Sequence, residues 1–599
     1  MIGCKKGPTT QAKDDRSPSK VVDQSAIASS QYVGSAACAD CHAEIAADFA
    51  MHSMGRSASL LTADVHMESI ENAKFEADGF RYRVEAKDGE WVHHQGRIGA
   101  SGKETAPIDL VAKHLIGSGN HGQSFLVQRD DYLMMSPITW YPDKQIWALS
   151  PGFEKNNSQF NRPVVDSCLY CHTDVASPVE HTLNRYASPA ISSHPIGCER
   201  CHGPGAEHVA HQNTQGTAES EDDSIVNPAK LDSDLREAIC NQCHLSGAVR
   251  VAKVGKNLRD YRPGQPLESA FTVFSLSDGE DRFVGHVEQM HASRCFQSSE
   301  GQMGCISCHD PHRLPSPIEH VAYYRGKCLE CHNEQSCANS IETRRAITKE
   351  DDCTQCHMPS IETEIQHAAI TDHSIPRVPN RETATPDSNA NPLIAFPSDV
   401  KAQPTARDKA IALVRVVGRN TSLFSEQQIV QAQRDLEQAV GDDESDIEAK
   451  EALAELYASE RNYDRALETL QSVLAIEPRR ERSLAMAGDI CTSTQAFGQA
   501  LGFWKSAVEV NPWMSKYWYR FAQSYAAAGD WNTAKQLAAE AKRRFPTSIG
   551  VRQILVQSHL ELGNRAEADR EFAELEEFNP PGFDSLKSWF EARVQRAAP

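Results

Sequence analysis

The chain has 599 residues, enough for two to four domains of ordinary size. Its formal net charge of −21 at pH 7 argues against binding nucleic acid, because contacts to phosphate need a basic surface. No run of eighteen apolar residues occurs, so we expect no segment that spans a membrane. The 18 cysteines are too many for unligated thiols in a reducing cytosol, and all but Cys491 precede residue 360.

Residues 1–31 are rich in Lys, Ser, Asp and Gln and have no hydrophobic period, which predicts a flexible tether. The opening letters MIGC are typical of the end of a bacterial lipobox. We therefore expect a longer signal sequence and a lipid on Cys4 that tethers the protein to a membrane. An unmodified cysteine at this position is the alternative.

Residues 32–376 contain a pattern, Cys-x-x-Cys-His, that occurs seven times. Two thiols three residues apart can each bond one vinyl group of the same porphyrin, and the next histidine then lies beneath the iron. A redox dithiol or half of a zinc site could explain one such motif, but zinc does not require a histidine after every pair. The sequence therefore predicts seven covalently attached c-type haems. In chain order, motifs 1 to 7 are Cys38–Cys41–His42, Cys168–Cys171–His172, Cys198–Cys201–His202, Cys240–Cys243–His244, Cys305–Cys308–His309, Cys328–Cys331–His332 and Cys353–Cys356–His357.

Seven haems would leave roughly 50 residues for each, too few to build a protein core around every porphyrin. We therefore expect the haems themselves to form the core, with little regular secondary structure around them. Porphyrins packed in this way conduct electrons along the chain. Because thioether attachment takes place outside the cytoplasm, we also expect a periplasmic or cell-envelope location.

The sixth ligand of each iron decides between an electron carrier and a catalyst. The stronger candidates are His52, His208, His312 and His373, and the weaker ones are His121, His286 and His291. A surface histidine is the alternative for each. Because histidines are numerous enough to fill every sixth site, the sequence favours electron transfer between redox partner proteins. A multihaem oxidoreductase of nitrite, hydroxylamine or tetrathionate, with one open iron, is the alternative.

An aromatic-rich stretch, about residues 70–150, interrupts the motifs and predicts a small β-rich insertion. Within it FRYRVEAKDGEWVHH alternates apolar and polar residues around Asp88-Gly89, which predicts a β-hairpin. Two cysteines of the motif region, Cys295 and Cys337, belong to no motif. Free thiols are disfavoured in exported proteins, so we expect a disulfide between them, with two free thiols as the alternative.

Residues 377–404 are dense in Pro and Asn and have no period, which predicts a linker. Beyond it, residues 405–599 repeat every 34 residues. The repeated positions are Pro478, Pro512, Pro546 and Pro580, and Ala432, Ala466, Ala500, Ala534 and Ala568. This region resembles tetratricopeptide repeats; an unrelated helical bundle is the alternative. The resemblance implies an α-solenoid, a mainly α fold overall, and a protein or peptide bound on the concave face. We expect redox chemistry and recognition to be divisible at about residue 390.

The segments YVGSAACADCHAEIAADFAMHS, CERCHGPGAEH, CISCHDPH and CTQCHMP resemble the multihaem cytochromes related to tetrahaem cytochrome c-554. That family accepts electrons from hydroxylamine oxidoreductase. The resemblance covers most of residues 32–376 and implies that His208 and His312 are distal ligands to haems of other motifs. This chain differs by its seven motifs in place of four, its insertion and its repeats, so the family's electron donor does not transfer. The Cys-x-x-Cys-Lys motif of pentahaem nitrite reductases does not occur.

Overall fold

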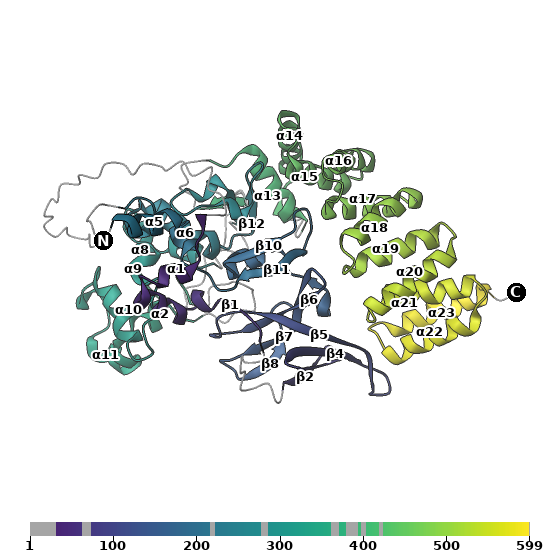
Figure 1. The fold of residues 1–599 in the computed structure, drawn as a ribbon, viewed down its shortest axis with the longest axis horizontal. Coiled ribbons are helices and arrows are strands. Elements are labelled where there is room, and N and C mark those ends of the chain that lie inside the picture. The colour runs from purple at the N-terminus through teal and green to yellow at the C-terminus, as the bar shows by residue number, and fades with distance from the viewer. Residues whose placement is uncertain are drawn as a thin grey trace.

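The computed structural model describes residues 31–62, 73–215, 222–276, 285–360, 371–378, 393–396, 403–418 and 423–597 (Figure 1). The helices of the motif region gather at one side of the molecule and the helical repeats at the other. Cys4, and all of the predicted tether except its last residue, lie outside the described residues. Within the described ranges, no helix is both long and apolar enough to cross a membrane.

The motif region contains short helices, some of which carry motif residues while others lie between motifs. They are α1 (Ser35–Ala39), α2 (Ala43–Met51), α3 (Asp166–His172), α4 (Glu199–His202), α5 (Ala206–Gln215), α6 (Ser233–His244), α7 (His286–Ala292), α8 (Arg294–Gln297), α9 (Cys305–Cys308), α10 (His320–Leu329), α11 (Ile341–Ile347) and α12 (Cys353–His357). No residue of α1, α2, α9, α10, α11 or α12 is buried. These six helices therefore have no core made of their own side chains, whereas α3, α6 and α7 each bury two or more residues.

A nine-stranded antiparallel sheet lies between motifs 1 and 2 in the chain. Its main path runs in the order β2-β3-β4-β5-β6-β7-β8, with β1 paired to β5 and β9 to β7. It is larger than the insertion predicted over 70–150, because strands begin before that range and end after it. The strands are β1 (Ala58–Leu60), β2 (Lys74–Ala77), β3 (Phe80–Lys87), β4 (Glu90–Ile98), β5 (Glu104–Ile116), β6 (Gln123–Arg129), β7 (Tyr132–Tyr141), β8 (Ile146–Leu149) and β9 (Arg162–Pro163).

The predicted hairpin is confirmed. Strands β3 and β4 pair antiparallel, and Lys87 lies opposite Glu90 across a two-residue turn. The turn residues Asp88 and Gly89 have φ angles of 54° and 78°. Two positive φ values in succession give the turn whose twist matches that of paired strands, and Asp-Gly adopts them at low cost.

Two smaller sheets complete the strands. Strand β10 (Val175–Pro178) pairs with β11 (Tyr186–Ser193), and β13 (Phe271–Leu276) pairs with both β12 (Val249–Ala252) and β14 (Leu393–Phe396). Strand β14 lies within the predicted linker, so the prediction of a linker without regular structure is wrong at these four residues. Apolar residues at both ends of β14 are buried against β13, which explains why it pairs despite the Pro-rich surroundings.

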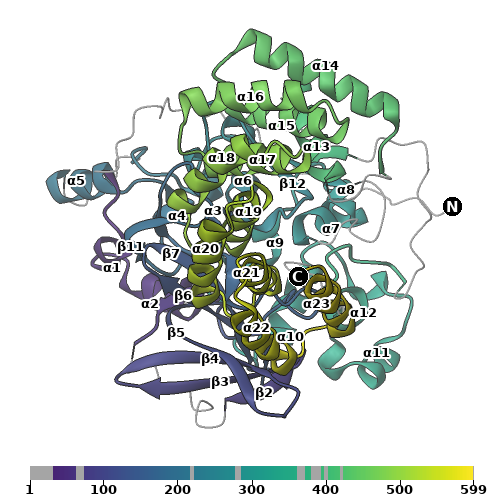
Figure 2. The same cartoon turned by 90° about the vertical axis from the view of Figure 1, so that its right-hand side faces the viewer.

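Five antiparallel helix pairs and one further helix form the repeats (Figure 2). Each of the five repeated alanines lies on the second helix of a pair and is buried, which lets the two helices approach closely. Each repeated proline follows the end of a helix by two residues. The helices are α13 (Ala406–Val417), α14 (Glu426–Asp442), α15 (Ile447–Ser459), α16 (Tyr463–Ile476), α17 (Glu481–Ser493), α18 (Phe497–Val510), α19 (Ser515–Ala527), α20 (Trp531–Arg544), α21 (Ile549–Glu561), α22 (Arg565–Phe578) and α23 (Phe583–Ala597).

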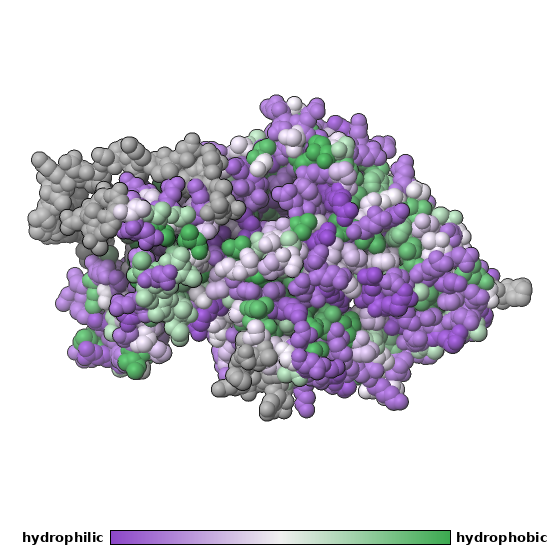
Figure 3. All heavy atoms as spheres, in the orientation of Figure 1, coloured by the Kyte–Doolittle hydropathy of each residue, from purple (hydrophilic) through white to green (hydrophobic). Residues whose placement is uncertain are grey.

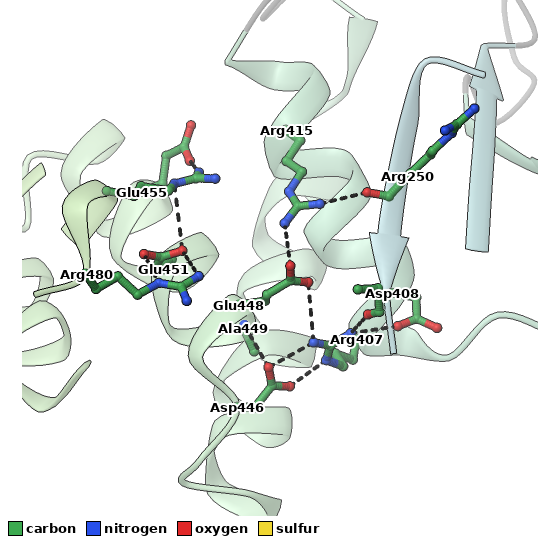
Figure 4. Close-up of polar contacts among 12 residues, drawn as sticks. Arg250, Arg407, Asp408, Arg415, Asp446, Glu448, Ala449, Glu451, Glu455 and Arg480 are labelled. Atoms are coloured by element: carbon green, nitrogen blue, oxygen red, sulfur yellow. Dashed lines mark hydrogen bonds and ion pairs between the residues drawn. The ribbon is translucent and has the colours of Figure 1, made fainter. Parts of the chain in front are cut away.

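The first repeat shares its core with the motif region. Val251 and Phe274, on β12 and β13, are buried in the same apolar cluster as Ile411 and Val414 of α13. Polar contacts surround this cluster (Figure 4): Arg415 donates to the carbonyl oxygen of Arg250 (2.8 Å). A cut at about residue 390 would therefore expose apolar surface, which contradicts the expectation of two divisible parts.

Turns between repeats also dock on the sheets. Near the end of α18, Tyr132 of β7 donates to the carbonyl oxygen of Val510 (2.6 Å). Asn511 donates to Asn184 (2.9 Å) between β10 and β11. At the end of α22, Arg97 of β4 donates to the carbonyl oxygen of Asn579 (2.8 Å). Because these contacts recur along the array, the repeats are fixed against the sheets along one edge.

Candidate cofactor sites

Each motif lies on or beside a short helix. In α3 and α12 the whole Cys-x-x-Cys-His sequence is helical. Residues three apart share one face of a helix, so both thiols of a motif lie on the same side. All fourteen motif cysteines are free thiols in the structure. This arrangement suits two bonds to one porphyrin.

Four motif histidines face a second imidazole ring. The ring centres of His42 and His208 are 6.3 Å apart, with planes inclined by 13°. The other three pairs are His202–His312 at 5.9 Å and 8°, His309–His373 at 6.3 Å and 29°, and His244–His286 at 6.0 Å and 89°. The predicted candidates His208, His312 and His373 thus all lie opposite a histidine of a motif other than the one they follow in the chain.

The spacing of these pairs matches two ligands on one metal. An imidazole nitrogen bonds a metal at about 2.0 Å, which places the ring centre roughly 3 Å from the metal. Two rings on opposite sides of one iron therefore have centres about 6 Å apart. Among the described residues, no group of three or more His, Cys, Asp or Glu side chains could hold a bare metal ion. Each pair would supply two ligands to an iron whose other ligands come from a porphyrin.

Several of these imidazole rings are oriented by a hydrogen bond at their Nδ1 atom. The Nδ1 atom of His208 lies 2.6 Å from the carboxylate of Asp222, and that of His202 lies 2.8 Å from the carbonyl oxygen of Val226. His357 and His373 make the same kind of contact with backbone carbonyl oxygens, at 2.9 Å and 2.7 Å. When Nδ1 carries the proton, Nε2 keeps its lone pair, which is the arrangement of a metal-bound histidine.

Burial lowers the pKa of five of the histidines in these pairs. Loss of water contact lowers the pKa of His286 to about 3 and that of His309 to about 4. Burial likewise lowers the pKa of His202, His244 and His373. A neutral imidazole is the form that binds a metal, so the rings need not lose a proton near pH 7.

Three other predicted candidates lie elsewhere. His52 is buried against Phe49, and its Nδ1 accepts a hydrogen bond from the backbone of Met54 (3.1 Å). His121 is exposed on the loop after β5. His291 packs against Phe296 (4.0 Å) and also against Phe396. The structure pairs none of these three with a motif histidine in the part of the chain that it describes, whereas it does pair His286, which the sequence ranked as a weaker candidate.

The histidines of motifs 6 and 7, His332 and His357, are not among the four that face a second imidazole ring. His367, which follows motif 7 in the chain, lies outside those residues. Helices α10, α11 and α12, which carry motifs 6 and 7 or lie between them, form a lobe at one edge of the molecule (Figure 2).

Several large apolar side chains of the motif region are exposed to solvent. Figure 3 shows apolar residues at the surface over this side of the molecule, whereas the last repeats present a mainly hydrophilic face. Met51 is 67% exposed, Ile318 is 90% exposed and Ile347 is 61% exposed. Large apolar groups on helices without a core of their own fit a region built around an apolar cofactor.

Sequence reasoning missed one buried histidine pair. Nδ1 of His114, on β5, lies 2.9 Å from Nε2 of His194, and Nε2 of His114 is buried without a hydrogen-bond partner. Burial lowers the pKa of His114 to about 4. The two residues are 80 positions apart in the chain, so neither spacing nor motif could have brought them together.

The predicted disulfide is not formed. Cys295 and Cys337 are both free thiols. Cys295 lies near Cys331 of motif 6, and Cys337 lies near Cys356 of motif 7. Each non-motif thiol thus neighbours a different motif, and the prediction that they bond to each other is wrong in this structure.

Comparisons with known families agree with two parts of this description. Residues 151–203, which include motifs 2 and 3, match the family described as cytochrome c554 and c-prime. Residues 423–489 match the family described as tetratricopeptide repeat. The chain therefore contains a cytochrome c554 domain, which implies c-type haem, and tetratricopeptide repeats.

Solved structures similar to the chain include several of MamA. "MamA AMB-1 P212121" is 23% identical, covers 28% of this chain and 87% of its own, and has a TM-score of 0.25. "MamA RS-1 ArsTM double mutant" is 17% identical, covers 30% of this chain and 96% of its own, and has a TM-score of 0.27. No curated protein is similar enough to count as a relative.

Proposed function

We propose that the protein is an exported electron carrier with a c-type haem at each of its seven motifs, and that its repeats hold a partner protein. A bound haem iron supplies one-electron chemistry by alternating between ferric and ferrous states. The two thiols of each motif hold the porphyrin, and the motif histidine binds the iron from one side. The opposing histidines, namely His208, His286, His312 and His373, bind it from the other.

One observation carries this proposal: four motif histidines each face a second imidazole at the distance that one iron spans. An iron with both axial positions filled has no place for a substrate, and it exchanges electrons without binding one. The haems of these four motifs are therefore electron carriers in our proposal.

Two measurements test the proposal. The mass of the denatured protein should exceed that of the polypeptide by seven haems. Electron paramagnetic resonance of the oxidised protein should show low-spin iron at the four paired sites. Fewer than seven haems in mature protein would show that at least one motif binds no haem. High-spin iron at a majority of sites would contradict an electron carrier and favour a catalyst.

A second candidate function is supported by motifs 6 and 7. His332 and His357 are not among the histidines that face a second imidazole, and this candidate function places an open iron in their lobe. The protein would then be an oxidoreductase of a small nitrogen or sulfur compound. Turnover of nitrite, hydroxylamine or tetrathionate, together with one high-spin haem that is lost in His357→Ala, would favour this function.

The repeats supply the partner site in our proposal. Between α19, α20, α21 and α23 lies a cavity of about 490 Å³. It is lined by uncharged aromatic and amide side chains, including Tyr519, Gln523, Trp531, Gln553, Gln557 and Trp589. We expect Trp531→Ala with Gln553→Ala to weaken partner association at least tenfold and to leave haem spectra unchanged. Lys505→Ala, on the exposed side of α18, is the matched control. Equal loss of partner affinity in both variants would show that the partner does not bind in this cavity.

The location outside the cytoplasm and the lipid on Cys4 also belong to this proposal. Covalent haem attachment requires export, and a lipid would hold the carrier near membrane-bound redox partners. Mass spectrometry of the N-terminal peptide distinguishes a lipidated Cys4 from an unmodified one.

A further inference from the structure

We propose that the seven motifs form a branched string in space whose order differs from their order in the sequence. The string runs from motif 1 through motifs 3, 4, 5 and 6 to motif 7, and motif 2 joins it at motif 4. The inference rests on the proposed function for the presence of a haem at each motif. The order itself comes from contacts between motifs.

Thiols of different motifs lie within hydrogen-bonding reach of one another. Because each thiol is the attachment point of a porphyrin edge, neighbouring thiols bring the edges of two haems together. These contacts join motif 1 to 3, motif 2 to 4, motif 4 to 5 and motif 6 to 7. The thiol pairs are Cys38–Cys198, Cys171–Cys243, Cys240–Cys305 and Cys328–Cys353.

Backbone contacts bind the start of the motif region to motif 3. The backbone N–H groups of Val33 and Gly34 donate to the carboxylate of Glu199, at 2.9 Å and 2.8 Å. The N–H of Cys198 donates to the hydroxyl of Ser35 (3.1 Å). Glu199 and Cys198 belong to motif 3, whereas Ser35 begins α1. Motif 1 is therefore held on motif 3, although the bonded residues are 163 to 166 positions apart in the chain.

Motif 2 lies against motif 4. Arg250 of β12 contacts both motifs, with Nη1 3.5 Å from the thiol of Cys171 and Nη2 3.4 Å from the carbonyl oxygen of Cys243. The hydroxyl of Tyr170, within motif 2, donates to Gln242, within motif 4 (3.1 Å). These contacts fix the branch.

Gln242 also links motif 4 to motif 3. Its amide nitrogen donates to the carbonyl oxygen of Arg200 (3.1 Å). The guanidinium of Arg200 in turn donates to the carbonyl oxygen of Tyr170 (2.8 Å), so motif 2 has a second contact with motif 3. Motif 4 therefore neighbours motifs 2 and 3 at once and is the junction of the string.

The remaining motifs follow in chain order. Glu237 of α6 accepts hydrogen bonds from the backbone N–H of Cys305 (3.1 Å) and from its thiol (2.9 Å), which joins motif 4 to motif 5. The hydroxyl of Tyr324, on α10, lies 3.4 Å from Nδ1 of His309 and joins motif 5 to the helix of motif 6. Arg325 of α10 donates to Asp351 (3.0 Å), just before motif 7.

The proposed order predicts which haems lose contact when one is removed. Electron tunnelling falls exponentially with distance, so an electron entering at motif 7 reaches another haem rapidly only through its neighbours. Removal of motif 2 interrupts nothing, because it is a branch. Removal of motif 3 separates motif 1 alone.

The test injects electrons at one place. Ile347, which is 61% exposed on α11, is replaced by cysteine in a chain whose Cys4, Cys295 and Cys337 are serine. A ruthenium photosensitiser is attached to that thiol. The excited sensitiser passes one electron to a ferric haem, which becomes ferrous, and a sacrificial amine returns one electron to the sensitiser. A train of flashes repeats this one-electron step at least once for each haem, and absorbance then gives the fraction of haem reduced in the fast phase.

Two variants of this labelled chain distinguish the orders. In Cys168→Ala/Cys171→Ala, which lacks haem 2, we expect all remaining haems to be reduced in the fast phase. In Cys198→Ala/Cys201→Ala, which lacks haem 3, we expect all remaining haems except haem 1 to be reduced in the fast phase. A string that follows the sequence would instead lose haem 1 from the fast phase of the first variant, and haems 1 and 2 from that of the second. Those results would overturn the proposal.

Each variant decides the order without the other. Intact mass shows whether a variant has matured with all but one of its haems, and a variant that fails to mature leaves the decision to its counterpart. A parent chain with fewer than seven haems would contradict the proposed function, whereas a full set of haems with the sequence-ordered phases would contradict only the branched string.

Discussion

The repeats and the motif region bury apolar surface by different means. In the repeats, Ala466, Leu470 and Trp504 are fully buried between helices. In the motif region, six helices bury no residue at all, and Ile318 is 90% exposed. The comparison teaches that the repeats are stable through their own side chains, whereas those six helices would depend on the haems that we propose for their motifs.

The largest effect that tests this contrast is the loss of every haem. In chain produced without haem attachment, we expect fast amide exchange over residues 31–62 and 285–360, and retained protection over 423–597. The reason is that the repeats, residues 423–597, have a core made of their own side chains. Hydrogen exchange followed by mass spectrometry measures both ranges in one sample. Equal protection of the motif helices with and without haem would show that they fold unaided.

A core substitution in the repeats should be nearly as damaging. Trp504 is fully buried, and its indole N–H donates to the hydroxyl of Thr492 (3.0 Å). We expect Trp504→Ala to cost about 3–5 kcal/mol of stability, because it leaves a large cavity. The thermal unfolding of the repeats, followed by circular dichroism, measures the loss.

The matched control is Ile347→Ala in the lobe of motifs 6 and 7. Ile347 is 61% exposed, and a substitution at an exposed site away from special contacts changes stability by about 0.5 kcal/mol or less. Equal shifts of the unfolding midpoint in the two variants would contradict the contrast between the two regions.

At the interface between the two regions, we expect the loss of a buried hydrogen bond to lower stability more than the loss of buried apolar area. The side chain of Asn511 is buried and donates to Asn184 and to Glu481, both at 2.9 Å. We expect Asn511→Ala to cost about 1–3 kcal/mol, because both acceptors stay buried without this donor. Chemical denaturation of the full chain measures the change. Asn532→Ala, on the solvent side of α20, is the control, and a comparable loss there would assign the effect to the helices themselves.

The sequence predicts the local features of both regions better than their contacts. The Asp88-Gly89 hairpin and the 34-residue repeat were predictable because each depends on residues close in the chain. The seven motifs were visible for the same reason. The expectation of two divisible parts was wrong because Val251 and Ile411, which share one core, are far apart in the sequence.

Distal histidines show the same limit. His286 is not adjacent to any motif, and only the fold places it 6.0 Å from His244. The pairing of Cys295 with Cys337 was predicted from number and compartment, without any information on distance. His114 and His194 come from a strand and a loop whose meeting no local pattern indicates.

The smallest expected effect is a pH dependence at the same interface. The carboxylate of Glu481 is buried and accepts hydrogen bonds from the N–H of Leu183 (2.8 Å) and the hydroxyl of Tyr517 (3.0 Å). Burial raises the pKa of Glu481, although these hydrogen bonds oppose the shift. A raised pKa means that the folded chain binds the proton more tightly than the unfolded chain, so stability rises as this group becomes protonated.

The sign gives a window for the measurement. The contribution is fully present below the unfolded pKa of about 4.3 and is lost as pH rises through the higher folded pKa. Glu481→Gln should lower the unfolding midpoint by the same amount at every pH, because its amide nitrogen cannot accept a hydrogen bond from the N–H of Leu183. It should also flatten the fall of the unfolding midpoint with rising pH above pH 4.3. Midpoints of thermal unfolding at a series of pH values, compared with Glu455→Gln at a more exposed site, measure that decline. Parallel curves for the parent and Glu481→Gln would mean that this carboxyl has the same pKa in both states and that the interface is indifferent to its charge.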